Sequence, residues 1–378
     1  MKRIFPLIAG VFILASIFAG HASAATCTNI PTTAFNSFFS GYAGPAQFNA
    51  AKVNPTGTVS GDIDATGCSL GIYYGPGVTG KVDGATIHNA IVAGILNDGA
   101  AVTVSNNVIH DIGAQPIIAD NSGSVAFPSN GSPLGFGIYM CGMGTAGGCS
   151  SNDAATGNIS NNFIWFYQKG GIVIHGPSAT SNITDNTITG LGPISRLAQN
   201  GIEVGLGATV NMTGNFISNH SYTGSGGATG DGIIGFGGAC NGGALEVGNK
   251  VSRNTLLQND IGVQYFNADA NCSSTATQTK DIIESNIIRN NSVTNTSGAT
   301  YAPPPNPPPA CATGSTLPCP YQAGIQDTGN SDRIYGNFVC GVGYTPGPPP
   351  GALVAIDTSS GSTNPYLALN TTSGSGCN

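Results

Sequence analysis

One spacing of apolar and polar residues returns seven times along the chain: an apolar residue, two variable positions, an asparagine, one variable position and a second apolar residue. The copies run over Val104–Ile109, Ile159–Ile164, Ile183–Ile188, Met212–Ile217, Val251–Leu256, Ile283–Ile288 and Ile334–Val339. An eighth copy, Val82–Ile87, has Ala85 in place of the asparagine. A short unit repeated in this way indicates one structural element stacked many times.

The distance between copies varies, and the variation indicates insertions. Ile87 and Ile109 are 22 residues apart, and Ile164 and Ile188 are 24 residues apart, which would be one bare turn of a coil. The step from Ile109 to Ile164 is 55 residues. It holds either one long insertion or a further turn whose pattern has decayed near residues 137–140.

A second pattern, a glycine followed by an alternating strand, comes after most copies. Its members begin at Gly94, Gly137, Gly171, Gly201, Gly232, Gly262 and Gly324. Alternation with Val, Ile and aromatic residues predicts half-buried strands, and 57 glycines with 23 prolines would interrupt helices. Together the patterns predict an all-β parallel β-helix, in which each strand pairs with its equivalent one turn later, about 4.8 Å away. Stacking would place the apolar markers in interior columns. The asparagines would form a ladder, because asparagine tolerates left-handed backbone and its amide can bond the neighbouring turns.

These two patterns resemble the repeat of the right-handed parallel β-helix proteins of the pectin-lyase-like superfamily, over roughly residues 60–360. The resemblance implies a single-stranded, right-handed parallel β-helix. It leaves the activity open, because the superfamily holds polysaccharide lyases, hydrolases, epimerases, phage tailspikes and adhesins. We divide the chain into a signal peptide (1–24), an N-terminal cap (25–60), the β-helix (61–360) and a C-terminal tail (361–378).

The amino terminus has the features of a secretory signal peptide. Lys2 and Arg3 precede an apolar run, and Ala22-Ser23-Ala24 offers a small-residue cleavage site. The alternative is a retained membrane anchor. No other stretch is long and apolar enough to span a bilayer. We therefore expect a secreted monomer that is extracellular, on the cell surface or in a periplasm.

Ten cysteines fit an oxidising compartment. Proximity suggests the pairs Cys27–Cys68, Cys141–Cys149, Cys240–Cys272, Cys311–Cys319 and Cys340–Cys377. No C-x-x-C pair occurs, which argues against zinc.

Charge is sparse: 8% of the residues are charged and the formal net charge is −7. No basic stripe is available for a phosphate backbone, which argues against nucleic acid. A surface rich in Asn, Ser, Thr, Gly and scattered aromatic residues suits sugars, and we expect a polysaccharide as the partner. The plainer interpretation is that exported repeat proteins share this composition whatever they bind.

The open ends of a coil need caps. Phe35, Phe38, Phe39 and Tyr42 stand at near-helical spacing and predict a short amphipathic cap at the amino end, while Ala352–Ile356 predicts a closing strand. Insertions rich in Gly, Ser and Pro fall at 113–157, 219–246, 267–280 and 295–322. If they leave from one corner they would wall a groove, and loops on a rigid scaffold often carry function.

In the glycine-initiated strands, the residues two and four positions after the glycine should point outward. Stacked in order, the first outward column reads Leu96, Tyr139, Val173, Glu203, Ile234, Gln264 and Gln326, and the second reads Asp98, Cys141, His175, Gly205, Phe236, Phe266 and Thr328. Aromatic rings stack on sugar faces and amides bond hydroxyls, so we expect substrate contacts from Tyr139, Phe236, Gln264, Phe266 and Gln326. The alternative is a solvated sheet face whose aromatics are covered by the insertions.

Five ionisable side chains gather on three successive predicted turns: Lys169, His175, Arg196, Glu203 and Asp231. A uronate lyase or epimerase needs a base and a cation, roles open to Lys169, His175 or Arg196. A glycoside hydrolase needs two carboxyls about 5 to 10 Å apart, and Glu203 with Asp231 is the pair available. Against a catalytic interpretation, Asp231 precedes its glycine and could sit in a turn, and the grouping could be an accident.

Other motifs add little. The Asp-Asp pair and Gly-His-Gly segment expected of polygalacturonase-like hydrolases are missing, as is the Asp-Pro-His-Asp run of alginate epimerases. Asp62 and Asp64 supply too few oxygen ligands to argue for calcium, so turn capping is the simpler role and we expect no cofactor. His88 and His110 stand alone in the sequence.

The sequence thus favours an exported β-helix protein that binds an extracellular or cell-wall polysaccharide and, in the enzymatic version, cleaves it as a lyase or hydrolase. The alternative is a non-catalytic surface or adhesive protein whose coil is a rigid spacer.

Overall fold

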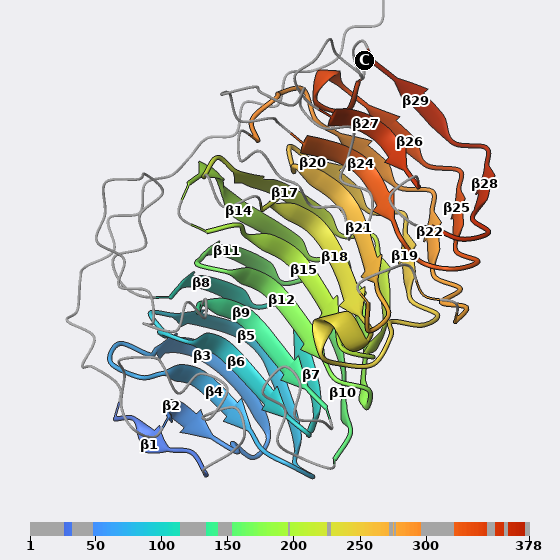
Figure 1. Cartoon of the computed structure of the whole chain (residues 1–378). Coiled ribbons are helices and arrows are strands. Elements are labelled where there is room, and N and C mark those ends of the chain that lie inside the picture. The colour runs from blue at the N-terminus through green and yellow to red at the C-terminus, as the bar shows by residue number, and fades with distance from the viewer. Residues whose placement is uncertain are drawn as a thin grey trace, which may run out of the picture.

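The computed structural model describes residues 26–31, 48–113, 134–142, 153–195, 197–224, 228–271, 275, 277–295, 321–345, 352–358 and 362–374. Within these residues the chain consists of short strands and two single-turn 3₁₀ helices, η2 (Ala239–Asn241) and η3 (Val342–Tyr344). The strands lie side by side in long stacks that ascend the molecule (Figure 1). We name these the A, B and C stacks.

The A stack holds the glycine-initiated strands. In spatial order it contains β1 (Thr28–Asn29), β2 (Asn49–Val53), β4 (Leu70–Tyr74), β6 (Ala93–Asp98), β9 (Phe136–Cys141), β12 (Gly170–His175), β15 (Asn200–Gly205), β18 (Asp231–Gly237), β21 (Ile261–Asn267), β24 (Tyr321–Asp327) and β27 (Ala352–Asp357). The first pair, β1 with β2, is antiparallel, and every later neighbour is parallel.

The B and C stacks hold the strands on either side of each repeat asparagine. Two long strands, β3 (Thr58–Asp64) and β5 (Thr79–His88), run through both stacks. The B stack continues with β7 (Ala101–Ser105), β10 (Ala155–Ser160), β13 (Ala179–Thr184), β16 (Thr209–Thr213), β19 (Lys250–Ser252), β22 (Ile282–Glu284), β25 (Arg333–Tyr335) and β28 (Tyr366–Ala368). The C stack continues with β8 (Val108–Ile112), β11 (Phe163–Tyr167), β14 (Thr187–Ile194), β17 (Phe216–Tyr222), β20 (Thr255–Leu257), β23 (Ile287–Arg289), β26 (Phe338–Cys340) and β29 (Thr371–Ser373). One turn therefore runs from B through C to A, and the expected parallel β-helix is confirmed.

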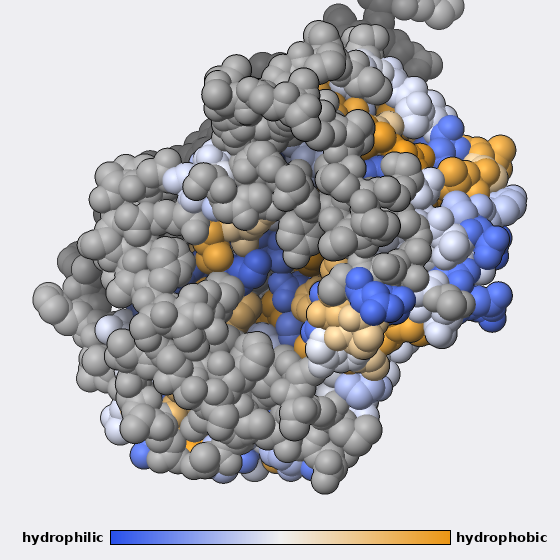
Figure 2. Space-filling view, in the orientation of Figure 1, coloured by the Kyte–Doolittle hydropathy of each residue, from blue (hydrophilic) through white to orange (hydrophobic). Residues whose placement is uncertain are grey.

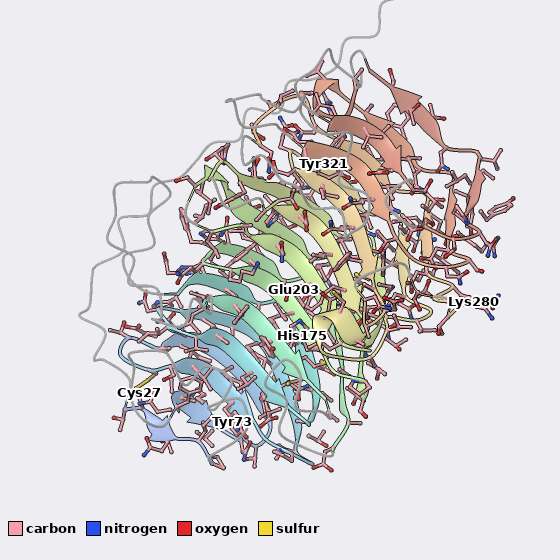
Figure 3. The ribbon with its side chains drawn as sticks, in the orientation of Figure 1. Cys27, Tyr73, His175, Glu203, Lys280 and Tyr321 are labelled. Atoms are coloured by element: carbon pink, nitrogen blue, oxygen red, sulfur yellow. A yellow bond between two sulfur atoms is a disulfide. The ribbon has the colours of Figure 1, made fainter. Side chains whose placement is uncertain are left out.

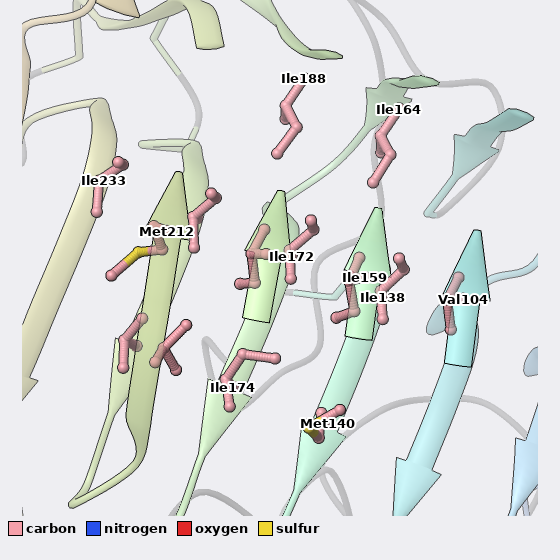
Figure 4. Close-up of a cluster of buried hydrophobic side chains, with 14 of the residues drawn as sticks. Val104, Ile138, Met140, Ile159, Ile164, Ile172, Ile174, Ile188, Met212 and Ile233 are labelled. Carbon is pink, nitrogen blue, oxygen red and sulfur yellow. The ribbon is translucent and has the colours of Figure 1, made fainter. Parts of the chain in front are cut away.

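The apolar markers of the repeat stack in one interior column. Ile164, Ile188 and Ile217 are successive register partners, and each is fully buried. They belong to one core with inward side chains of the A stack such as Ile138 and Ile172 (Figure 4). The core is continuous because the parallel register repeats the same apolar position on each turn.

The repeat asparagines form the expected ladder. The side-chain amide of Asn186 donates to Asn215 Oδ1 (3.0 Å) and to the Ile159 carbonyl (2.9 Å). Its own Oδ1 accepts from the backbone and side-chain amides of Asn162 (3.0 and 2.9 Å). Each rung is thus tied to the rungs above and below it by a buried amide.

The ladder runs from Asn107 to Asn370 with the same donor direction throughout. Left-handed backbone occurs at the residue before the ladder asparagine, as at Asn161 (φ 54°) and Asp185 (φ 55°). Of the two roles expected for the repeat asparagine, the amide bonding between turns is confirmed. The left-handed backbone is found at the preceding residue instead.

The 55-residue step between Ile109 and Ile164 contains no further turn. Ile109 and Ile164 are direct register partners, as are Val104 and Ile159. The segment near residues 137–140 is β9, the A strand of that same turn. The first interpretation, a long insertion, is therefore correct.

The stacks extend beyond the expected boundaries of the coil. Strand β2 begins at Asn49, and β28 and β29 continue the B and C stacks to Ser373. Strands β9 and β18 lie inside two of the ranges expected to be insertions, because each turn needs its A strand. The expected closing strand is β27, but it is not the last. The expected cap at residues 35–42 lies outside the described residues.

The disulfide Cys27–Cys68 is confirmed, with a Cα–Cα distance of 5.5 Å. It ties β1 to the start of the coil. Cys141, Cys240 and Cys340 are also disulfide-bonded. The partners suggested for these three, and the suggested pair Cys311–Cys319, lie outside the described residues.

Candidate functional site

The outward face of the A stack carries both predicted columns in the predicted register. The first column runs Tyr73, Leu96, Tyr139, Val173, Glu203, Ile234, Gln264, Gln326 and Asp357. The second runs Asp98, Cys141, His175, Gly205, Phe236 and Phe266. The residues that alternate with these columns, such as Ile172 and Ile174, belong to the interior core.

A third outward column, which strict alternation misses, lies three residues before the first. Asn200 shows its direction, because its side-chain amide donates to Glu203 Oε2 at 2.8 Å. Gly201 separates the two columns at a point where a Cβ would lie 2.5 Å from the Gly232 carbonyl oxygen. Asp231 is the register partner of Asn200 and therefore belongs to this column, on a strand rather than in a turn.

Three side chains from successive A strands form a hydrogen-bonded chain across the first two columns. His175 Nε2 lies 3.1 Å from Glu203 Oε1, and His175 Nδ1 lies 2.9 Å from the Tyr139 hydroxyl. The His175 ring also stands edge-on to the rings of Tyr139 and Phe236. The structure thus brings His175 and Glu203 together as the register predicted, near the middle of the stack (Figure 3).

The two carboxyls have opposite electrostatic surroundings. Burial alone would raise the pKa of Glu203, but the hydrogen bond from His175, the charges of Lys169 and His175 and the amide of Asn200 together lower that pKa to about 2. Burial raises the pKa of Asp231 well above its ordinary value, and the nearby carboxylates add to the rise. Asp231 Oδ1 is buried and has no hydrogen-bond partner among the described residues. These opposite shifts favour the ionised form of Glu203 and the protonated form of Asp231.

Lys169 lies close to both carboxyls and contributes to lowering the pKa of each. Its ammonium group donates to the Ala198 carbonyl at 3.0 Å, which fixes the side chain. The remaining predicted member of the group, Arg196, lies outside the described residues.

The residues expected to bind substrate divide into two groups. Tyr139, Gln264 and Gln326 are almost completely buried, and the Gln264 amide donates to Gln326 Oε1. Phe236 and Phe266 are register partners and remain partly exposed. Of the three aromatic residues in this set, only Phe236 and Phe266 are therefore accessible.

The surface near this site is of mixed polarity. In the orientation that places Glu203 and His175 near the centre of the A stack (Figure 3), hydrophilic and hydrophobic residues lie next to each other in the same region (Figure 2).

No group of three or more His, Cys, Asp and Glu side chains is placed to hold a metal ion within the described part of the chain. Asp64 caps its own turn by accepting from the Thr66 backbone amide at 3.0 Å. The histidines that seem isolated in the sequence are in fact stacked: the rings of His88 and His110 are 5.2 Å apart, and His110 lies 4.7 Å from Trp165. Each of the three residues directly follows a marker of the repeat, and the register of the repeat therefore stacks them.

No protein-family model and no curated protein sequence matches this chain. Among solved structures, the complex of XylC with xylose is similar, with a TM-score of 0.41 and 14% sequence identity. The similarity covers 71% of this chain and 37% of XylC, so this chain corresponds to well under half of that protein. In the described residues, no helix is both long and apolar enough to cross a membrane.

Proposed function

We propose that this protein is exported and binds a polysaccharide over the outward face of the A stack, where Asp231 and Glu203 hydrolyse it. The observation that supports the proposal is a pair of neighbouring carboxyls whose pKa values are displaced in opposite directions. Two titratable groups separated in this way are suited to act as general acid and general base.

In the proposed reaction, Asp231 gives its proton to the glycosidic oxygen as the bond to the sugar carbon breaks. In one route Glu203, already ionised, removes a proton from a water whose oxygen bonds to the sugar carbon, and this proton is then returned through solvent to Asp231. In the other route Glu203 attacks the sugar carbon and forms an ester. Asp231, now a carboxylate, then takes a proton from the water that hydrolyses this ester, which restores both carboxyls. Asn200 and His175 each bond one oxygen of Glu203 and hold the carboxylate in place. Phe236 offers a ring for a sugar face.

Hydrolysis is favoured over a lyase reaction by the same geometry. A lyase acting on a uronate needs a cation free to face the substrate carboxylate. The Lys169 ammonium already donates to the Ala198 carbonyl, and the ionised Glu203 beside it would repel an anionic sugar. A neutral glycan meets no such repulsion.

The test is an assay for new reducing ends and for unsaturated products on neutral glycans and polyuronates. We expect reducing ends from a neutral glycan and none of the unsaturated products. Glu203→Gln and Asp231→Asn should each lower kcat by at least about a hundredfold, while Glu284→Gln, which removes a carboxylate on the B stack, should leave it unchanged. A wild-type protein that produces neither product on any of these substrates would refute the enzymatic proposal.

The second candidate is a non-catalytic spacer. It is favoured by the internal bonding of the outward face, where Tyr73 donates to Asp98 at 3.2 Å and Tyr321 donates to Asp357 at 2.9 Å. If this candidate holds, the protein binds its partner without turnover, and Glu203→Gln leaves that binding unchanged.

Export is supported by the disulfide Cys27–Cys68, since such bonds persist in oxidising compartments. Amino-terminal sequencing of the secreted protein should give a chain that starts at Ala25. A protein retained in the reducing cytoplasm with its first 24 residues in place would contradict this part of the proposal.

A further inference from the structure

A groove crosses the outward face of the B stack, away from the A-stack site. It has a volume of about 530 Å³ and spans strands β5, β7, β10, β13 and β16. We name it the B groove, and its side chains include Thr79, Thr103, Asn158, Thr180, Asn182 and Asn211. This volume lies within the range of about 300–1,000 Å³ that is usual for ligand sites.

The B groove repeats the same chemistry on successive turns. Thr156, Thr180 and Thr209 are register partners, so their hydroxyls form one row along the coil axis. Asn182 pairs with Asn211, and their amides form a second row beside the first. Rungs of a parallel stack are about 4.8 Å apart, which is close to the length of one pyranose unit in an extended glycan.

The asparagine row is joined by side-chain hydrogen bonds within the protein. The Asn182 amide donates to Asn158 Oδ1 at 3.0 Å, and the Asn211 amide donates to Asn182 Oδ1 at 3.2 Å. These side chains are nevertheless exposed to solvent, so each amide keeps a second N–H for a ligand. A prearranged row of this kind loses little conformational entropy on binding.

The B groove carries no charged side chain in its lining. Lysines stand only at the ends of the amide row, where Lys81 is ion-paired with Asp83 (2.8 Å) and Lys250 with Glu284 (2.6 Å). The polar side chains of the lining are hydroxyls and amides. It complements a neutral polyhydroxylated chain and gives an anionic polymer no partner.

We propose that the B groove is a second glycan-binding site, which holds one extended neutral polysaccharide chain along the coil axis. It is separate from the A-stack face, so the protein would engage the polymer on two sides of the coil. The inference extends the proposed function but does not depend on catalysis.

The test measures binding of cellohexaose, xylohexaose and hexagalacturonate by titration calorimetry in a Glu203→Gln background, which removes turnover. Thr180→Trp fills the B groove, and Thr371→Trp places the same side chain on an exposed strand outside it. We expect at least one neutral hexamer to bind, and Thr180→Trp to weaken it by about tenfold or more through loss of two or more hydrogen bonds. Thr371→Trp should change nothing, and hexagalacturonate should not bind at this site.

Three outcomes would overturn the proposal. One is equal binding in the two tryptophan variants, and another is failure of every neutral hexamer to bind. The third is a wild-type dimer in light scattering that Thr180→Trp converts to a monomer, because the groove would then be a contact between copies. The two sites are told apart by Asp231→Asn. This variant should no longer produce reducing ends, and it should still bind the neutral hexamer in the B groove.

Discussion

Replacing a central ladder asparagine should destabilise the coil far more than replacing a terminal one. In Asn215→Ala, the amide loses its bonds to Asn254 Oδ1 (2.9 Å) and the Ile183 carbonyl (2.9 Å). The backbone and side-chain amides of Asn186 both lose their acceptor, at 3.0 Å each. Four buried bonds at about 1 kcal/mol each, with a further penalty for the groups left without partners, give a loss of about 4–6 kcal/mol.

The matched control is Asn370→Ala at the end of the ladder. Its oxygen accepts from both amides of Asn337 (3.0 and 3.0 Å) and its amide donates to the Ile334 carbonyl (2.8 Å), but water reaches these groups. We expect a loss of about 1–2 kcal/mol, since solvent replaces part of the bonding. Denaturant unfolding of both variants gives the two free energies. Equal losses would refute the view that each buried amide ties three rungs together.

Two further predictions concern the core and the pH dependence. Ile188→Ala should lower the free energy of unfolding by about 2–5 kcal/mol, whereas Phe163→Ala, at a ring that is 44% exposed, should cost far less; similar losses in thermal melts would contradict the inward direction of the marker column. Burial raises the pKa of Glu246 from 4.5 to about 8 and that of Asp260 from 3.8 to about 6. Both carboxyls bind their protons more tightly in the folded state, so their contribution to stability is complete below about pH 4 and should be lost as the pH rises through 6 for Asp260 and through 8 for Glu246, by about 5 kcal/mol for Glu246 alone. A melting temperature that rises steadily over that range would show that burial does not control these groups.

The fold could be predicted from the sequence because the register is written in the spacing. Ile164, Ile188 and Ile217 occupy the same position of one repeat, and a parallel stack leaves them no other arrangement than one above the other. The same register predicted that Glu203 lies near His175. Glu203 follows Gly201 by two positions, and His175 follows Gly171, the equivalent glycine one turn earlier, by four. Insertions of any length at a corner leave this register unchanged.

The parts of the site that could not be predicted depend on local geometry and on burial. Asn200 donates to Glu203 although the two residues are three positions apart, and strict alternation would place such residues on opposite faces of the strand. The raised pKa of Asp231 comes from its burial beside Asp260, which is 29 residues further along the chain. The B groove was missed because Thr180 and similar residues occupy variable positions of the repeat, where the spacing predicts an outward direction but says nothing of a hollow.

The most direct measurement of the central claim is the pH profile of kcat/KM on a neutral glycan for the wild-type protein, Glu203→Gln and Asp231→Asn. Our account predicts that activity falls at low pH as Glu203 takes up a proton, with its pKa near 2, and falls at high pH as Asp231 loses one. Asp231→Asn should abolish the alkaline limb along with most of the activity, because the amide has no proton to give. Wild-type activity and an unchanged profile in both variants would show that the two carboxyls only hold the coil together.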